Sequence, residues 1–244
     1  MADPMHFEQH AASYDEARPP YPPELWQRIA ELGGLRPGLR AVDLGAGSGQ
    51  ATRVLLAAGL DVTAVEPGEQ LAVQIRTRYP AAQVLESTAE AAELGQAVFD
   101  VAVVATAIHW MDLDVLLPRL HRALAPGGLL LVFRNVYGDE TAEVTSFRAR
   151  VAEIVARRHA PSRRGLEVGA STEDALTRGG LFETISHDDF SWEIDLDEHQ
   201  IRLLFGTFSD WSAAEVEEAA LAVRDLGGSV TEHYRSWLIA LRRT

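Results

Sequence analysis

The chain has 244 residues, 47% of them hydrophobic, which is enough for one α/β domain with a core of its own. Its formal net charge of −14 argues against nucleic acid as a partner, because phosphate neutralisation requires a clustered basic surface. Cysteine is absent, which excludes disulfides and thiol catalysis. Asp3, His6 and Glu8 stand where a signal peptide would need an apolar segment, and no apolar run is long enough to span a bilayer. We therefore expect a cytoplasmic protein without a membrane partner.

Residues 1–40 are predicted to form an N-terminal arm. Prolines between positions 19 and 23 favour extended or turned chain, and the apolar spacing over 24–32 predicts a helix after them. The arm either packs its aromatic side chains on the outside of the domain or forms a lid that excludes water from a ligand. The lid hypothesis makes three of its residues candidates for the site: Tyr14, Arg18 and Tyr21.

Residues 41–135 alternate between strand-like and helix-like segments. The pattern predicts strands at 41–44, 61–66, 82–85, 99–106 and 129–133, with helices at 50–58, 69–79 and 112–125. Such alternation is typical of a doubly wound, mostly parallel, Rossmann-like sheet, whose ligands bind at the carboxyl ends of the strands. Four polar residues fall at or just past those ends: Asp43, Glu66, Thr88 and Thr106.

A glycine-rich loop joins the first predicted strand to its helix. Its sequence, residues 43–49, is Asp-Leu-Gly-Ala-Gly-Ser-Gly, and its glycines allow positive φ angles and close approach of a ligand. A dinucleotide fingerprint would place its third glycine at position 50, which is Gln50 here. Glu66 follows the loop at the distance at which an acid reaches a ribose, where it can accept bonds from both hydroxyls.

After residue 135 the alternation changes. Helices are expected at 140–158, 173–177, 198–205 and 213–226, and strands at 182–196 and 230–241. We interpret the chain as a single domain, 1–244. It would comprise the arm (1–40), a cofactor-binding core (41–135), a helical cap or insertion (136–182) and a completion of the sheet by an antiparallel C-terminal hairpin (183–244).

Several motifs in this order resemble those of class I S-adenosylmethionine-dependent methyltransferases. They are residues 43–49, Val65-Glu66-Pro67, Thr88-Ala89-Glu90, Ala107-Ile108-His109-Trp110 and Leu124-Ala125-Pro126-Gly127-Gly128. The resemblance is to the methyltransferase type 11 group, which includes trans-aconitate methyltransferase-like proteins, and it covers about residues 7–135. It implies direct in-line methyl transfer from S-adenosyl-L-methionine to a small organic molecule. Thr88 departs from the group, in which many members have Asp at this position.

The resemblance also implies roles for individual residues. Those expected to bind the cofactor are Asp43, Gly45, Ala46, Gly47, Gly49, Glu66, Pro67, Thr88, Ala89, Glu90 and Ala105, together with Tyr14 and Arg18 of the arm. Those expected to bind the acceptor are Tyr21, His109 and Trp110. His109 is the candidate catalytic residue, either as a general base or as a group that orients the acceptor. The scattered histidines predict no metal site.

Two alternatives to a methyltransferase stay open at this point. A nicotinamide-dependent oxidoreductase can use a similar sheet, although Gln50 and the absence of lysine, and so of a Tyr-x-x-x-Lys pair, count against it. A non-catalytic protein that binds S-adenosylmethionine would carry the same loop and the same acid. The acceptor, the atom that receives the methyl group and the oligomeric state do not follow from the sequence.

Overall fold

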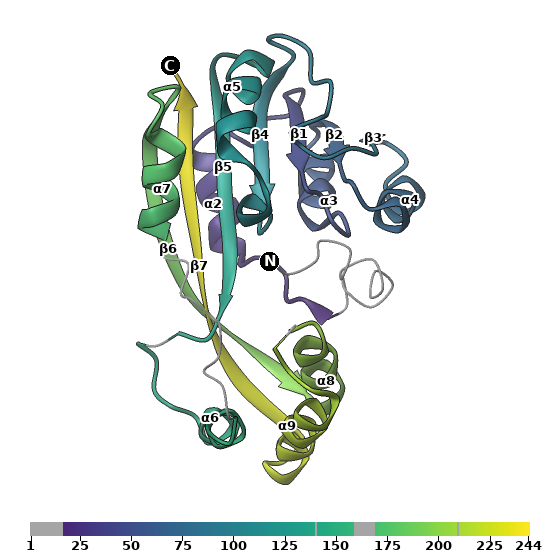
Figure 1. Cartoon of the computed structure of the whole chain (residues 1–244), viewed down its shortest axis with the longest axis vertical. Coiled ribbons are helices and arrows are strands. Elements are labelled where there is room, and N and C mark those ends of the chain that lie inside the picture. Colours follow the sequence, from purple (N-terminus) through teal and green to yellow (C-terminus); the bar gives the residue numbers. More distant parts are fainter. Residues whose placement is uncertain (1–16, 140, 159–168, 209) are drawn as a thin grey trace. The chain divides into compact units, whose positions relative to one another are not determined.

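Seven strands form one sheet in the part of the chain that the computed structural model describes, residues 17–139, 141–158, 169–208 and 210–244. Their order is β3-β2-β1-β4-β5-β7-β6, and β7 runs opposite to its neighbours (Figure 1). Their bounds are β1 (Arg40–Leu44), β2 (Asp61–Val65), β3 (Gln83–Leu85), β4 (Phe99–Ala105), β5 (Leu124–Tyr137), β6 (Phe182–Asp197) and β7 (Ser229–Arg243). The doubly wound, mostly parallel sheet with antiparallel C-terminal strands is confirmed.

The register of the parallel strands brings their carboxyl ends to one edge. Leu44 of β1 is opposite Val65 of β2, and Ala105 of β4 is opposite Phe133 of β5. The residues that follow β1, β2, β3 and β4 therefore emerge side by side, which is where ligands bind in such sheets.

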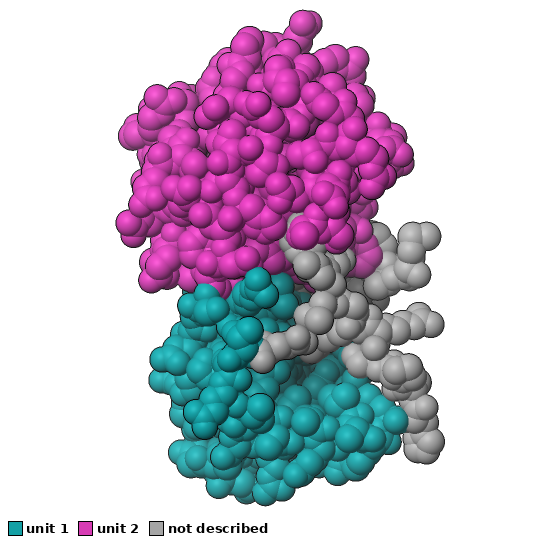
Figure 2. Space-filling view, turned by 90° about the vertical axis from the view of Figure 1, so that its left-hand side faces the viewer, with its two compact units in different colours: residues 1–20, 136–166, 191–235 teal, residues 21–135, 167–190, 236–244 magenta. Residues whose placement is uncertain are grey.

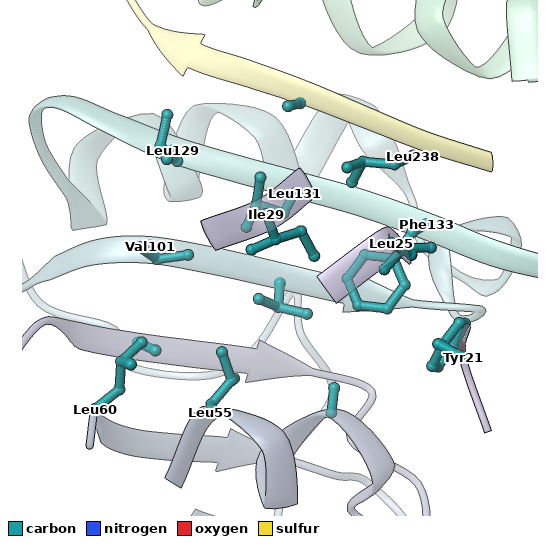
Figure 3. Packing of buried hydrophobic residues seen from close by; sticks show 14 of the residues in the cluster. Tyr21, Leu25, Ile29, Leu55, Leu60, Val101, Leu129, Leu131, Phe133 and Leu238 are labelled. Atoms are coloured by element: carbon teal, nitrogen blue, oxygen red, sulfur yellow. The ribbon is translucent and has the colours of Figure 1, made fainter. Parts of the chain in front are cut away.

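Helices cover the sheet because its central strands are apolar on both faces. The helices are α2 (Pro23–Glu31), α3 (Gln50–Ala57), α4 (Glu69–Arg78), α5 (Leu113–Ala123), α6 (Ser146–Ala156), α7 (Gly169–Thr177), α8 (Glu198–Gly206) and α9 (Ala213–Asp225), with the 3-10 turn η2 (Ile108–Trp110). Leu25 and Ile29 of α2 pack in one core with Leu131 and Phe133 of β5 (Figure 3). Leu130 lies between Leu129 and Leu131 on β5 and is also fully buried, so the opposite face is covered too.

The chain forms two compact units, which Figure 2 colours separately. The sheet unit comprises residues 21–135, 167–190 and 236–244, and the helical unit comprises residues 1–20, 136–166 and 191–235. Strands β5, β6 and β7 each begin in one unit and end in the other. The single-domain interpretation and its subdivision stay predictions.

The helical unit has its own core, built from one face each of α6, α8 and α9. It includes Phe147, Ile154, Ile201, Phe205 and Val223. The same unit holds an ion pair between a partly exposed arginine and a buried acid, with Arg148 Nε 2.9 Å from Glu232 Oε2. The Arg148 guanidinium carbon also lies 3.9 Å from the centroid of the Tyr137 ring. Burial raises the pKa of Glu232, and the charge of Arg148 opposes that rise.

Several element boundaries differ from the sequence-based expectation, and two of these differences are large. The helix expected at 140–158 begins only at Ser146, because the Thr145 hydroxyl accepts the Arg148 N–H and caps it there. The strand expected at 129–133 extends over 124–137, since Leu124 already pairs with Phe99 before an irregularity in the ladder. No described helix is long and apolar enough to cross a membrane.

Candidate functional site

The glycine loop after β1 has a backbone that side chains would not tolerate. Gly45, Gly47 and Gly49 have φ angles of 65°, 58° and 87°. A Cβ on Gly45 would lie 2.7 Å from the Cβ of Ala107, and one on Gly49 would lie 2.6 Å from Tyr79. A Cβ on Gly47 would meet no heavy atom within 4 Å. Of the three glycines, Gly47 therefore faces space in which a ligand can approach the backbone.

Most backbone N–H groups of this loop already have an acceptor within the protein. Those of Gly45 and Ala46 donate to the Val65 carbonyl at 2.8 and 3.1 Å, and that of Gly49 donates to the Ala46 carbonyl at 2.9 Å. The Gly47 N–H donates to Glu66 Oε2 at 2.8 Å. The loop is thus held by the end of β2.

Glu66 is buried at the end of β2, with 5% of its surface exposed. Its second carboxylate oxygen, Oε1, accepts the Gly68 N–H at 2.9 Å. The Glu66 carbonyl accepts the Ser87 N–H at 3.2 Å, so the same residue also holds the chain that follows β3. Each carboxylate oxygen has two lone pairs, which lets the carboxylate accept ligand hydroxyls in addition to these N–H groups.

Asp43 is a fully buried carboxylate on β1. The Thr52 hydroxyl donates to its Oδ2 at 2.6 Å, and its Oδ1 has no hydrogen-bond partner among the described residues. Burial raises the pKa of Asp43 to about 6; the Thr52 hydrogen bond opposes the rise and the charge of Glu66 adds to it. A buried acceptor left without a donor destabilises the fold, and a ligand that supplies a donor or a positive charge relieves that cost.

The segment predicted to bind an adenine, residues 88–90, lies at the same edge. Ala89 is buried with 4% exposure, whereas Thr88 is exposed. Glu90 Oε1 accepts the Asp112 N–H at 2.8 Å and so ties this segment to the start of α5. Pro67, directly after Glu66, is exposed.

The end of β4 brings together the residues predicted to face the acceptor. His109 and Trp110 lie in η2 with ring centroids 4.8 Å apart, and both are exposed. They come four and five residues after Ala105, the partly buried last residue of β4. Tyr21 reaches the same edge, because its hydroxyl lies 2.5 Å from Thr106 Oγ1.

The special backbone of Thr106 could not be read from the sequence. The sequence places a polar residue at this strand end, but nothing in it indicates the observed φ of 60°. Left-handed backbone is rare for β-branched residues, so a Thr carries no local signal for it. Thr106 contacts Phe133 and Tyr21, which are distant in the sequence, so only the folded structure shows these contacts.

The arm is described only from Ala17 onwards. Tyr14 lies outside the described residues. Arg18 belongs to the helical unit, where its guanidinium carbon lies 5.2 Å from the centroid of the Phe208 ring. The roles of Tyr14 and Arg18 at the cofactor, and the lid, stay predictions.

Other parts of the described chain offer less. A hollow of about 340 Å³ is lined by Glu93, Leu94, Gly95, Gln96, Arg119 and Arg122. Because residues 93–96 precede β4, this hollow lies toward the amino edge of the sheet, away from the glycine loop. The described residues contain no group of three or more His, Cys, Asp or Glu side chains that could hold a metal ion.

The raised pKa of Asp43 predicts that its ionisation destabilises the fold. A carboxyl whose folded-state pKa of about 6 exceeds its ordinary value of 3.8 stabilises the fold fully below pH 3.8, and that contribution is lost as the pH rises through 6. The free energy of unfolding of the wild type, relative to that of Asp43→Asn, should therefore fall by roughly 2 kcal/mol between pH 4 and pH 7. Urea denaturation across this range measures the difference. The exposed Asp61→Asn is the matched control, and a pH-independent difference for Asp43→Asn would contradict the argument.

Comparison with known proteins agrees with this geometry. The family model described as a methyltransferase domain matches residues 42–132. An uncharacterized methyltransferase of Mycobacterium tuberculosis is 31% identical over 188 residues, which are 77% of this chain and 70% of that protein. A solved structure described as a type II methyltransferase from Anaeromyxobacter dehalogenans is 28% identical, with a TM-score of 0.62 over 92% of this chain and 96% of that one. Geranyl diphosphate methyltransferase in complex with SAM shares the fold at 14% identity, with a TM-score of 0.54 over 100% and 92% of the two chains. The chain belongs to the methyltransferase family.

Proposed function

We propose that the carboxyl edge of this sheet binds S-adenosyl-L-methionine and that the protein transfers its methyl group to a small organic acceptor. The observation that carries the proposal is the pairing of the glycine loop with two buried carboxylates, Asp43 and Glu66. Both carboxylates can accept hydrogen bonds. S-adenosyl-L-methionine carries groups that suit such acceptors, namely two ribose hydroxyls, an ammonium group and a sulfonium cation. The membership of the methyltransferase family supports the same donor.

The loop suits this donor better than a dinucleotide. A pyrophosphate binds to backbone N–H groups that point at it. Here the N–H groups of Gly45, Ala46, Gly47 and Gly49 are bound by the protein's own acceptors. A phosphate at Gly47 would in addition meet the Glu66 carboxylate, which accepts the Gly47 N–H, and like charges repel. A sulfonium ligand that needs acceptors meets no such conflict.

In this proposal Glu66 accepts the ribose hydroxyls, while the Asp43 carboxylate favours the cationic part of the donor electrostatically. Gly47 supplies the close backbone approach, and residues 88–90 contact the adenine ring. Ala105 lies next to the amino acid part of the donor, and Pro67 follows the ribose-binding acid. Tyr14 and Arg18 would close over the donor from the arm.

When bound, the sulfonium supplies an activated methyl group, so the chain has to orient the acceptor and exclude water. Trp110 offers an exposed aromatic face for an organic acceptor at the end of β4. We assign His109 to the orientation of the acceptor rather than to proton removal, because a base is needed only for a protonated nucleophile.

A thermal-shift comparison of nucleotide ligands tests the proposal directly. A ligand that binds only the native state adds about 2.7 kcal/mol to the free energy of unfolding at a hundredfold excess over its Kd. S-adenosylmethionine and S-adenosylhomocysteine should thus raise Tm by about 5–10 °C for a chain of this size. NAD and NADP should leave Tm unchanged. A shift with NAD alone, or no shift with any of the four, would overturn the proposal.

Glu66→Gln should weaken binding of S-adenosylhomocysteine by about one to two orders of magnitude, because hydrogen bonds to a charged group are worth about 1.5–3 kcal/mol. Isothermal titration calorimetry measures the loss, with the exposed Glu69→Gln in the first turn of α4 as the control.

The Gln side chain also disturbs the bonds from Gly47 and Gly68, so a second ligand separates the two causes. An S-adenosylhomocysteine analogue without ribose hydroxyls should bind the wild type and Glu66→Gln about equally. If the analogue loses as much affinity as the parent ligand, Glu66 acts through the loop and not on the ribose.

His109→Asn tests the choice between orientation and base catalysis. Under the orientation role, methyl transfer to an acceptor found with labelled S-adenosylmethionine should fall modestly, with an unchanged pH profile. Under the base role, turnover should fall by about 10²–10⁴-fold, and an acidic limb between pH 5 and 8 should vanish. Cofactor binding should survive in both cases. A lost limb in a variant that still binds S-adenosylhomocysteine would make His109 the base.

A further inference from the structure

Thr106 occupies an unusual conformation at the point where β4 leaves the sheet. Its φ is 60°, and Ala97 is the other non-glycine residue with a positive φ in the described part of the chain. A β-branched side chain in this region is disfavoured, so the surrounding structure has to hold it there. Glycine occupies many other positive-φ positions of this chain, which makes a threonine here informative.

Two bonds hold Thr106 in place. Its N–H donates to the Phe133 carbonyl at 2.8 Å, which fixes the backbone against β5. Its hydroxyl lies 2.5 Å from the Tyr21 hydroxyl, which joins it to the segment that precedes α2. Tyr21 is held in the core, because the residue is only 9% exposed and its ring packs edge-on against Phe133 at 4.8 Å (Figure 3). The Trp26 ring also packs edge-on against it, at 6.0 Å.

The turn at Thr106 determines where the next residues lie. Ala107 follows directly, and its Cβ occupies the place next to Gly45 that leaves no room for a side chain there. His109 and Trp110 follow in η2, and Met111 Cε also lies against Gly45. If Thr106 relaxed to an ordinary φ, the chain direction after β4 would change, and these residues would move away from the glycine loop.

We propose that Tyr21 and Thr106 are positioning residues, whose hydroxyl pair locks the turn after β4 and thereby fixes the acceptor wall, His109 and Trp110, against the donor-binding loop. The proposal rests on the proposed function, since it names what orders the acceptor side of that site. The Tyr21 hydroxyl holds the turn after β4 in place, while the Tyr21 ring packs in the hydrophobic core. Neither residue exchanges a proton with the reactants.

Two isosteric substitutions remove the hydroxyl pair from opposite sides. Tyr21→Phe keeps the packed aromatic ring. Thr106→Val keeps a β-branched side chain, which is disfavoured at a positive φ just as that of Thr is. Ala97→Gly is the matched control, because it relieves the other positive-φ residue, which precedes β4 at its far end.

The first readout is the ¹⁹F spectrum of protein labelled with 5-fluorotryptophan. The chain has five tryptophans, so the Trp110 resonance is assigned by its loss in Trp110→Phe. The second readout is the Kd for S-adenosylhomocysteine. In Tyr21→Phe and Thr106→Val, the Trp110 resonance should shift or broaden. Kd should rise about three- to tenfold, the size of one hydrogen bond. The double variant should add nothing further, because both changes remove the same bond.

The outcomes separate the two proposals. If both variants lose thermal stability but keep the wild-type Trp110 resonance and Kd, Tyr21 only packs, and the positioning role is overturned. If wild-type protein does not bind S-adenosylhomocysteine, the proposed function fails, while the Trp110 resonance still reports on the turn. A change of similar size in Ala97→Gly would also overturn the proposal. Failure of both hydroxyl variants to fold would contradict a role confined to positioning.

Discussion

The candidate site depends on the hydrogen bonds between the Glu66 carboxylate and the backbone of two loops. One oxygen binds the Gly47 N–H and the other binds the Gly68 N–H, while the Glu66 carbonyl holds Ser87. One buried acid thus joins the chain after β1, β2 and β3 in a single rigid edge. The charge strengthens these bonds beyond what a neutral acceptor would give, which explains why an acid is suited to this position. The same acid is the group that we propose for the ribose, so in this proposal its position is fixed by the protein's own hydrogen bonds.

Burial of a second acid beside the first has an electrostatic cost. The pKa of Asp43 is raised mainly because the carboxylate lies out of water, and the charge of Glu66 adds to that effect. Thr52 satisfies one oxygen of Asp43 but not the other. Such an arrangement destabilises the fold, and in our proposal a cationic ligand offsets this cost, since a positive charge near a desolvated carboxylate interacts strongly. Local strain and unsatisfied groups of this kind concentrate at functional sites.

The residues that follow β4 form the other part of this sheet edge, where we propose that the methyltransferase binds its acceptor. Thr106 turns the chain so that Ala107 packs against Gly45, and η2 then presents His109 and Trp110. Ala107 and Met111, on either side of η2, therefore lie against Gly45 of the glycine loop, so we expect a change in one segment to affect the other. This coupling suits a direct transfer, in which the reacting atoms have to be aligned rather than activated by the protein.

The sequence by itself determined the order of strands and helices, the glycine loop and the acid after β2, because these depend on hydrophobic period, glycine spacing and chain distance, which are local. It also indicated that polar residues follow the strands, and the register confirmed that they emerge at one edge. Only the tertiary structure decided that Glu66 binds Gly47, that Asp43 is fully buried with one unsatisfied oxygen, and that Tyr21 reaches Thr106, 85 residues away. Burial and long-range hydrogen bonds depend on which segments pack together, and no local pattern encodes that. The left-handed Thr106 is the clearest case, since its conformation is imposed by contacts with β5 and with the segment before α2 against its own preference.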